Sequence, residues 1–137
     1  MTIRAATPYL ILNGQAVRAI AFYERSLDAH TQSVQRFGDV NDSCPTALRE
    51  LVMHAELRVG SAPIFLSDGP GNAPLTKGGA VSIALDFDDV DEARRMFDAL
   101  ATSGNAIQPL MDAPWGALFG VVEDEFGISW MFNCAKS

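Results

Sequence analysis

The chain has 137 residues and a mass of 14.8 kDa, a length that suits a single domain with one ordinary core. Hydrophobic residues make up 48% of the sequence and charged residues 20%, which is typical of a globular protein and argues against disorder. The formal net charge of −7 argues against binding to nucleic acid or to an anionic membrane surface.

The cysteines and the N-terminal segment predict a cytoplasmic protein. Cys44 and Cys134 lie far apart and lack C-x-x-C spacing, so we expect reduced thiols rather than a disulfide or a zinc site. Residues 1–8 carry a single basic residue and lead directly into a strand-like segment, unlike a secretory signal. No apolar run approaches the ~20 residues that a transmembrane helix needs.

The first predicted elements are a strand and a helix. Residues 9–13 form a short apolar run that fits a buried strand. Asn13 is the expected N-cap of a helix over residues 14–27, which Asp28 and Ala29 end. Glu24 interrupts its apolar stripe, so small and aromatic residues must complete the buried arc: Val17, Ile20, Leu27, Ala16, Ala21 and Tyr23.

Three strands complete the first half of the chain. Residues 30–37 predict a polar strand, and residues 38–45 predict a loop. Residues 51–59 are the clearest strand, and a turn at residues 60–61 leads to its hairpin partner at residues 63–67. Alternation along the clearest strand predicts one face with Leu51, Met53, Ala55, Leu57 and Val59, and another with Val52, His54, Glu56 and Arg58.

The second half repeats this plan after a linker rich in glycine and proline at about residues 68–79. Asp89 and Glu92 predict a capping box for a helix that ends at Gly104. The helix should bury Val90, Ala93, Met96, Phe97 and Leu100. Strands are expected at residues 81–87, 107–110, 117–123 and 128–133, with a hairpin turn at residues 124–127.

The two halves predict an α+β fold made of two βαβββ modules in one domain, residues 1–137. The first module covers about residues 1–68 and the second about residues 80–137. Each module should pack one face of its sheet on its own helix. We expect the other two faces to form a curved mixed sheet around a shared cavity.

The doubled pattern and its local motifs resemble the vicinal oxygen chelate superfamily, which comprises glyoxalase, bleomycin-resistance and dioxygenase proteins. The run His54-Ala-Glu-Leu-Arg58 and the motif that begins Asp124-Glu-Phe-Gly127 are similar to the PhnB-like branch. The resemblance implies the glyoxalase/bleomycin-resistance fold and a homodimer. It rests on residues 8–10, 13–14, 19–27, 54–60, 65–68, 114–116, 119–120 and 124–133.

Metal-dependent members of the superfamily place His, Gln or Glu ligands on the first and last strand of each module. The resemblance puts these positions near Pro8, Phe65, Ser82 and Met131. None of these is a normal ligand for such a site, and one-residue shifts offer none better. We therefore predict no cofactor and no metal at the usual place, while a displaced divalent metal site stays open as an alternative.

The strand at residues 51–59 carries the candidate catalytic residues. His54 and Glu56 lie two residues apart on one face, so they suit a general acid–base pair, or a hydrogen-bond network with Arg58. Arg36 and Arg58 suit an anionic ligand, although both also fit solvated arginines on strands.

Apolar residues are expected to line the cavity. Trp115 lies on a loop before a strand and suits stacking on a planar ligand, a dimer interface or the core. Trp130 should face the helix as a core residue. The predicted cavity set is Arg36, Arg58, Phe65, Ser82, Trp115, Phe119 and Met131.

These residues favour a metal-free protein that binds a small, partly aromatic molecule. The alternative is a small lyase or isomerase that uses His54 and Glu56 as acid and base. Members of this branch often carry the label of a 3-demethylubiquinone methyltransferase. The only G-x-G, at residues 69–71, precedes no predicted helix, so methyltransferase chemistry is not expected.

Overall fold

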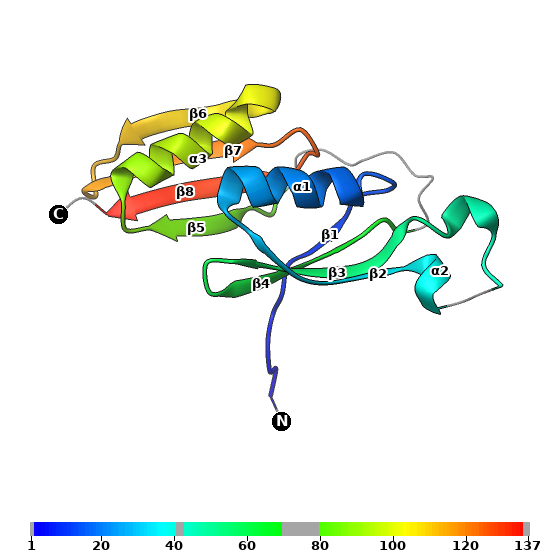
Figure 1. Cartoon of the computed structure of the whole chain (residues 1–137). Helices are drawn as coiled ribbons and strands as arrows, with labels where there is room; N and C mark the ends of the chain where they lie inside the picture. Colours follow the sequence, from blue (N-terminus) through cyan, green and yellow to red (C-terminus); the bar gives the residue numbers. More distant parts are fainter. Residues whose placement is uncertain (1, 41–42, 70–79, 136–137) are drawn as a thin grey trace. The chain divides into compact units, whose positions relative to one another are not determined.

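The computed structural model describes residues 2–40, 43–69 and 80–135 (Figure 1). The chain divides near residue 75 into two compact units. Each unit has a four-stranded mixed sheet and a helix of at least 12 residues, so the predicted α+β class and doubled βαβββ order are confirmed. Most of the predicted linker, residues 70–79, lies outside the described residues.

The first unit has the strand order β1-β4-β3-β2, in which β1 and β4 are parallel and the other pairs antiparallel. A short helix, α2 (Phe37–Val40), and a 3₁₀ turn (Thr46–Leu48) occur around the loop predicted at residues 38–45. Backbone hydrogen bonds from Phe37 and Gly38 to residues 49–51 stabilise this departure from a simple loop. The other elements are β1 (Tyr9–Ile11), α1 (Ala16–Leu27), β2 (His30–Arg36), β3 (Val52–Val59) and β4 (Ala62–Ser67).

Helix α1 differs from its prediction in its start and in its buried face. It starts after Gln15, which makes no side-chain cap, so the predicted cap at Asn13 is wrong. The Asp68 carboxylate instead accepts hydrogen bonds from the backbone N–H groups of Gly14 and Ala16. Val17 is 51% exposed. The buried residues are Ala16, Ala19, Phe22, Tyr23, Ser26 and Leu27.

A bulge in β3 changes which side chains share a face. Gln35 pairs with His54 and the next residue, Arg36, pairs with Val52, so Met53 is the extra residue between them. This insertion reverses the alternation at the start of the strand. Val52 is therefore fully buried, and its predicted place on the face of His54 is wrong.

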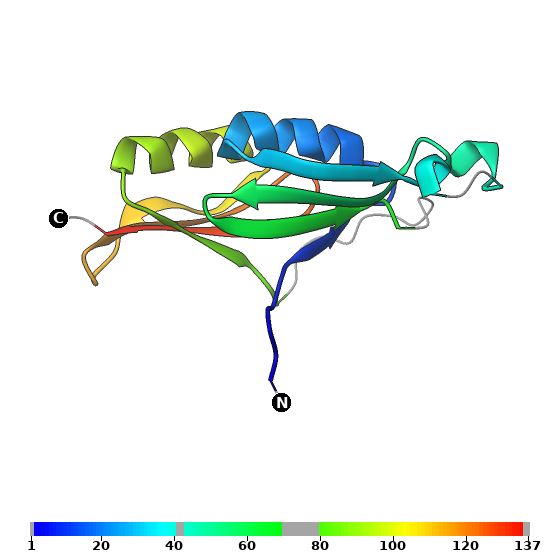
Figure 2. The same cartoon turned by 60° about the horizontal axis from the view of Figure 1, so that its bottom comes forward.

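The second unit follows its prediction closely and has the strand order β5-β8-β7-β6, with β5 parallel to β8. In Figure 2 each long helix lies along one side of the sheet of its own unit. The elements are β5 (Ile83–Phe87), α3 (Val90–Ser103), β6 (Asn105–Asp112), β7 (Ala117–Glu123) and β8 (Ser129–Ala135).

Helix α3 packs on its sheet through the predicted face. The side chain of Asp89 accepts hydrogen bonds from the backbone N–H groups of Asp91 and Glu92, which confirms the predicted N-cap. Ala93, Phe97 and Leu100 are buried. The close approach requires glycine on β7, because a Cβ at Gly120 would lie 2.9 Å from the ring of Phe97.

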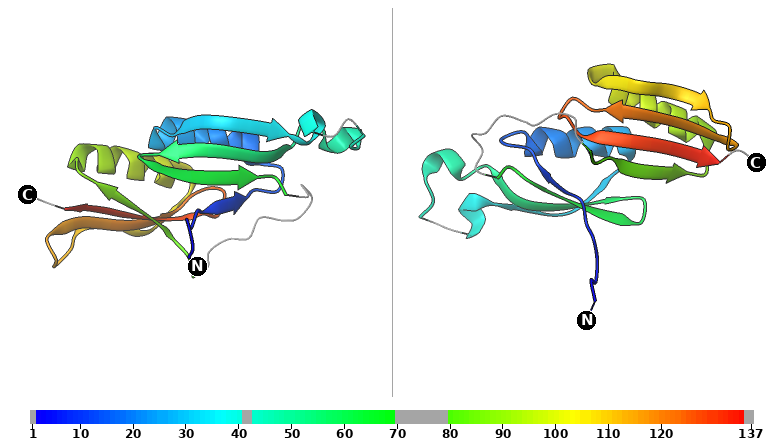
Figure 3. Two further views of the ribbon diagram at one scale, coloured as in Figure 1. Left: turned by 90° about the horizontal axis from the view of Figure 1, so that it is seen from below. Right: turned by 180° about the vertical axis from the view of Figure 1, so that it is seen from behind.

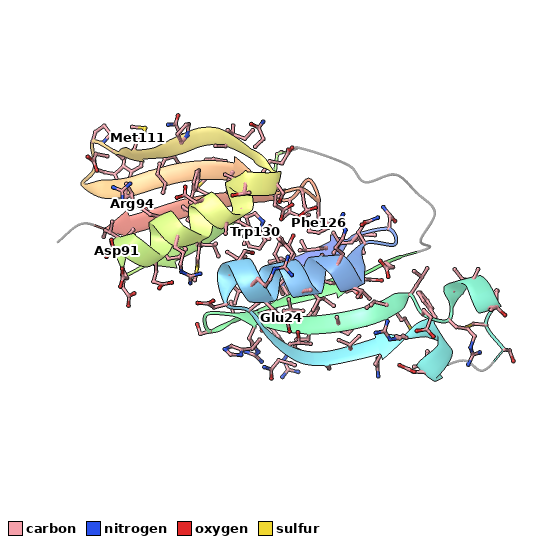
Figure 4. All side chains as sticks on the ribbon, turned by 45° about the horizontal axis from the view of Figure 1, so that its top comes forward. Glu24, Asp91, Arg94, Met111, Phe126 and Trp130 are labelled. Carbon is pink, nitrogen blue, oxygen red and sulfur yellow. The ribbon has the colours of Figure 1, made fainter. Side chains whose placement is uncertain are left out.

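The predicted hairpin turn between β7 and β8 is built around a buried carboxylate. Asp124 Oδ1 accepts the backbone N–H groups of Phe126 and Ile128, and Asp124 Oδ2 accepts Trp130 Nε1–H at 2.8 Å. Trp130 is fully buried, as predicted for a core residue, and lies near Phe126 (Figure 4). None of the helices in the described residues has the length and apolar run needed to cross a membrane.

Candidate functional site

The face of the first sheet that points away from α1 carries the candidate site (Figure 3, left). Four residues occupy one row across all four strands, because Tyr9 pairs with Phe65, Phe65 with Glu56, and Glu56 with Ser33. Cross-strand partners point to the same side of a sheet. The side chains of these residues and of His54 form the first open face.

Three rings gather on this face. Tyr9 Oη lies 2.8 Å from His54 Nδ1. The Phe65 ring meets the His54 ring at a centroid distance of 4.9 Å and the Tyr9 ring at 5.8 Å, both edge to face. Tyr9 is 47% exposed, and the other two rings are half-buried. We call these residues the Tyr9–His54–Phe65 cluster. It offers a ligand both apolar ring surface and a polar imidazole.

The charged residues on β3 form an ion pair beside this cluster. Arg58 Nη2 lies 3.3 Å from Glu56 Oε2, and both side chains are partly exposed. Glu56 is therefore paired with Arg58, whereas His54 is paired with Tyr9. A solvent-exposed pair of this kind contributes only about 0–1 kcal/mol, so an anionic ligand can compete for the guanidinium.

Arg36 lies apart from the other predicted residues of this unit. It pairs with the buried Val52 at the far end of β2, beyond the bulge. Its guanidinium Nη1 donates to the Glu50 carbonyl at 2.8 Å. The structure therefore brings together four of the predicted site residues in this unit, His54, Glu56, Arg58 and Phe65, but not Arg36.

The second sheet presents a different set of side chains on the side away from α3 (Figure 3, right). Phe119 is the cross-strand partner of Asn133, and the Trp115 and Phe119 rings meet edge to face at 5.4 Å. Asn133 Oδ1 accepts a long hydrogen bond from Trp115 Nε1–H at 3.5 Å. Met131 lies half-buried on the same side of β8. We call these residues the second open face.

The strand register changes two of the positions considered for metal ligands. The β1 neighbour of Phe65 is Tyr9, one residue beyond Pro8, and its hydroxyl already bonds His54. The β5 neighbour of Met131 is Ala84. Ser82 precedes β5, and its hydroxyl lies 2.6 Å from that of Ser129. Within the residues that the structure describes, no group of three or more His, Cys, Asp or Glu side chains is arranged to hold a metal ion.

Tyr9, Ser33 and Asn133 are the residues of these faces that the sequence does not predict as site residues. Tyr9 lies on a strand of three residues, which is too short to show alternation. Only the parallel pairing of β1 with β4 places its side chain beside Phe65 and His54. The signals available in the sequence were the motifs at residues 8–10 and 124–133, which contain Tyr9 and Asn133 but not Ser33.

Comparisons with known proteins identify the family. The family described as 3-demethylubiquinone-9 3-methyltransferase matches residues 4–132. Protein YjdN of Escherichia coli is 31% identical over 95% of both chains. The crystal structure of protein PA1353 from Pseudomonas aeruginosa has a TM-score of 0.84 and 36% identity, covering 98% of this chain and 100% of that one. The chain therefore belongs to this family.

Two further structures show a PhnB protein and a more distant protein with the same fold. A PhnB protein from Bacillus cereus, described as a putative 3-demethylubiquinone-9 3-methyltransferase, has a TM-score of 0.80 and 25% identity, covering 96% of this chain and all of that one. The fosfomycin resistance protein FosX from Listeria monocytogenes shares the fold alone, with a TM-score of 0.67 and 12% identity over 99% of this chain and 96% of that one. The chain is therefore PhnB-like, and its fold is the one that the resemblance to the vicinal oxygen chelate superfamily implied.

Proposed function

We propose that the protein binds a small, partly aromatic molecule without a metal, and that the ligand packs on the Tyr9–His54–Phe65 cluster. The observation that carries this proposal is the cluster itself, in which three rings remain partly exposed on one sheet face. Aromatic rings gathered around a polar group and still partly exposed are typical of the lining of ligand sites.

The arrangement of partners supports binding over acid–base chemistry. A carboxylate that activates an imidazole must lie within hydrogen-bond reach of it. Here the His54 imidazole is hydrogen-bonded to Tyr9, and the Glu56 carboxylate forms its ion pair with Arg58. A lyase or isomerase that uses His54 remains the second candidate, because its half-buried imidazole has a hydroxyl partner that could pass a proton. Methyltransferase activity is not proposed, since the described sheets are mixed and lack the doubly wound parallel order of a Rossmann domain.

A panel of planar aromatic acids, phenols and neutral heterocycles tests the proposal. Binding to the full chain would be followed by ligand-observed NMR and by the rise in Tm that a native-state ligand produces. We expect members of the panel to bind, and Phe65→Ala to weaken them about tenfold or more, because it removes ring contacts at the centre of the cluster. Val17→Ala, on the exposed surface of α1, is the matched control and should leave binding unchanged. Failure of every compound to bind, or equal binding to Phe65→Ala, would contradict the proposal.

We also infer a cytoplasmic homodimer. The family resemblance supports the homodimer, and the free thiols of Cys44 and Cys134 suit a reducing compartment. Light scattering at micromolar and nanomolar concentrations would give the mass in solution. A mass of one chain throughout this range would contradict the homodimer.

A further inference from the structure

We propose that Tyr9 is a positioning residue that fixes the tautomer of His54, so that the other ring nitrogen is presented to the ligand as a hydrogen-bond donor. The ligand is then a planar molecule that carries an acceptor oxygen, such as a ring carbonyl, a phenolate or a carboxylate. This inference rests on the proposed binding function and names the class of ligand.

The contact between the two side chains determines the tautomer. Tyr9 Oη lies 2.8 Å from His54 Nδ1, a distance at which one atom donates and the other accepts. A phenol is a stronger proton donor than neutral imidazole, and an imidazole nitrogen is a stronger acceptor than a phenol oxygen. The stronger of the two possible bonds therefore runs from Tyr9 Oη–H to Nδ1. A neutral imidazole that accepts at Nδ1 carries its proton on Nε2.

Ring packing holds the imidazole in this orientation. The Tyr9 and His54 rings are 5.5 Å apart and tilted by 59°, and the Phe65 ring lies against His54 from β4 at 4.9 Å. His54 is thus contacted from β1 and from β4. Gln35 is its cross-strand partner on β2. A ring supported on two sides loses little further rotational freedom when a ligand binds, which favours affinity.

The Nε2 atom is the ring nitrogen left for a ligand. Within the described part of the chain, Tyr9 is the hydrogen-bond partner that the structure gives His54. The groups nearest along β3 favour the same kind of ligand, because Arg58 adds a donor-only cation whose pair with Glu56 is weak. The aromatic rings supply surface for the plane of the ligand, and the donors select a molecule with an acceptor oxygen.

Nitrogen NMR of the full-length protein without ligand tests the positioning role. Long-range ¹H–¹⁵N spectra at mildly alkaline pH distinguish the two neutral tautomers of His54. We expect the form protonated at Nε2 in the native protein and a mixture of both forms in Tyr9→Phe, which keeps the ring and loses the hydroxyl. A native protein in which the His54 imidazole is protonated at Nδ1, or an unchanged spectrum in Tyr9→Phe, would overturn the inference. Neither result would contradict the proposed binding function.

Two planar probes of similar size test the ligand class. Coumarin carries a carbonyl oxygen, whereas 1-methylindole carries no acceptor oxygen. We expect coumarin to bind about three- to tenfold more tightly, the effect of one hydrogen bond. His54→Phe, which keeps an aromatic ring, should abolish that preference while both probes still bind. Equal binding of the probes to the native protein would refute the acceptor requirement and leave the proposed function standing. Failure of both probes to bind would count against the proposed function itself, whatever the tautomer.

Discussion

The helices α1 and α3 are similar in length and occupy equivalent places in the two units, but they begin in different ways. Helix α3 is capped by Asp89, the residue immediately before it. Helix α1 is capped by Asp68, which lies 52 residues further along the chain than Ala16. The start of α3 is therefore encoded locally, and the start of α1 depends on the folding of the whole first sheet.

Asp68 also joins more segments of the chain than Asp89 does. Asp68 is buried, and its two carboxylate oxygens accept the backbone N–H groups of Gly14, Ala16 and Val52. These groups belong to the turn after β1, the first turn of α1 and the start of β3. One side chain thus joins three segments. Asp89 is exposed and serves only the first turn of its own helix.

The largest expected effect is therefore that of Asp68→Ala. The substitution leaves the buried backbone donors of Ala16 and Val52 and the partly exposed donor of Gly14 without their acceptor, and buried unpaired donors cost about 1–3 kcal/mol each. We expect the free energy of unfolding to fall by about 3–5 kcal/mol, which is exceptional for one substitution. Urea unfolding followed by far-UV circular dichroism would measure the change. Amide exchange should accelerate at Gly14, Ala16 and Val52 before it does elsewhere.

Asp68→Asn is the matched control for this substitution. The amide keeps one acceptor oxygen and replaces the other with a donor, so part of the network survives. Its loss of stability should lie between those of the native protein and Asp68→Ala. If Asp68→Ala lowered the free energy of unfolding less than Asp89→Ala does, the start of α1 would not depend on its remote cap more than α3 depends on its local one.

A smaller effect is expected for Asp89→Ala on α3. This substitution removes an exposed N-cap whose donors can bond water instead, which typically costs about 1 kcal/mol. The loss should be restored almost completely by Asp89→Ser, another good N-cap. The same urea titration measures both variants. A loss for Asp89→Ala as large as that for Asp68→Ala would mean that Asp89 has a structural role beyond its own helix.

Local signals predicted most of the second unit. The capping residues, the face of α3, the turn at Asp124 and the exact span of β7 all depend on residues near one another in the sequence. The first unit was predicted less well, because two of its features depend on tertiary structure. The sequence pattern places Asp68 in the linker, and the apolar pattern does not indicate the bulge at Met53.

The same distinction applies to the candidate site. His54 and Glu56 share a face because they are two residues apart on one strand, and that relation can be predicted from the sequence. The hydrogen-bond and ion-pair partners of these two residues cannot be predicted in this way. Tyr9 reaches His54 only because β1 runs parallel to β4 in a register that pairs Tyr9 with Phe65. A pattern of residue types therefore locates the face of a site, whereas its hydrogen bonds follow from strand register.

The smallest expected effect is that of Val17→Ala on α1, and the larger loss expected for Ala19→Val serves as its comparison. The apolar pattern predicted Val17 as buried, but the structure exposes 51% of it and buries the neighbouring Ala19 completely. We expect Val17→Ala to change the free energy of unfolding by less than about 0.5 kcal/mol, since alanine is also the better helix former. Ala19→Val should instead cost about 1–3 kcal/mol, because two methyl groups enter a closely packed position. Denaturation of both variants measures which face of α1 is buried. A substantial loss in Val17→Ala with none in Ala19→Val would restore the face that the sequence pattern predicted.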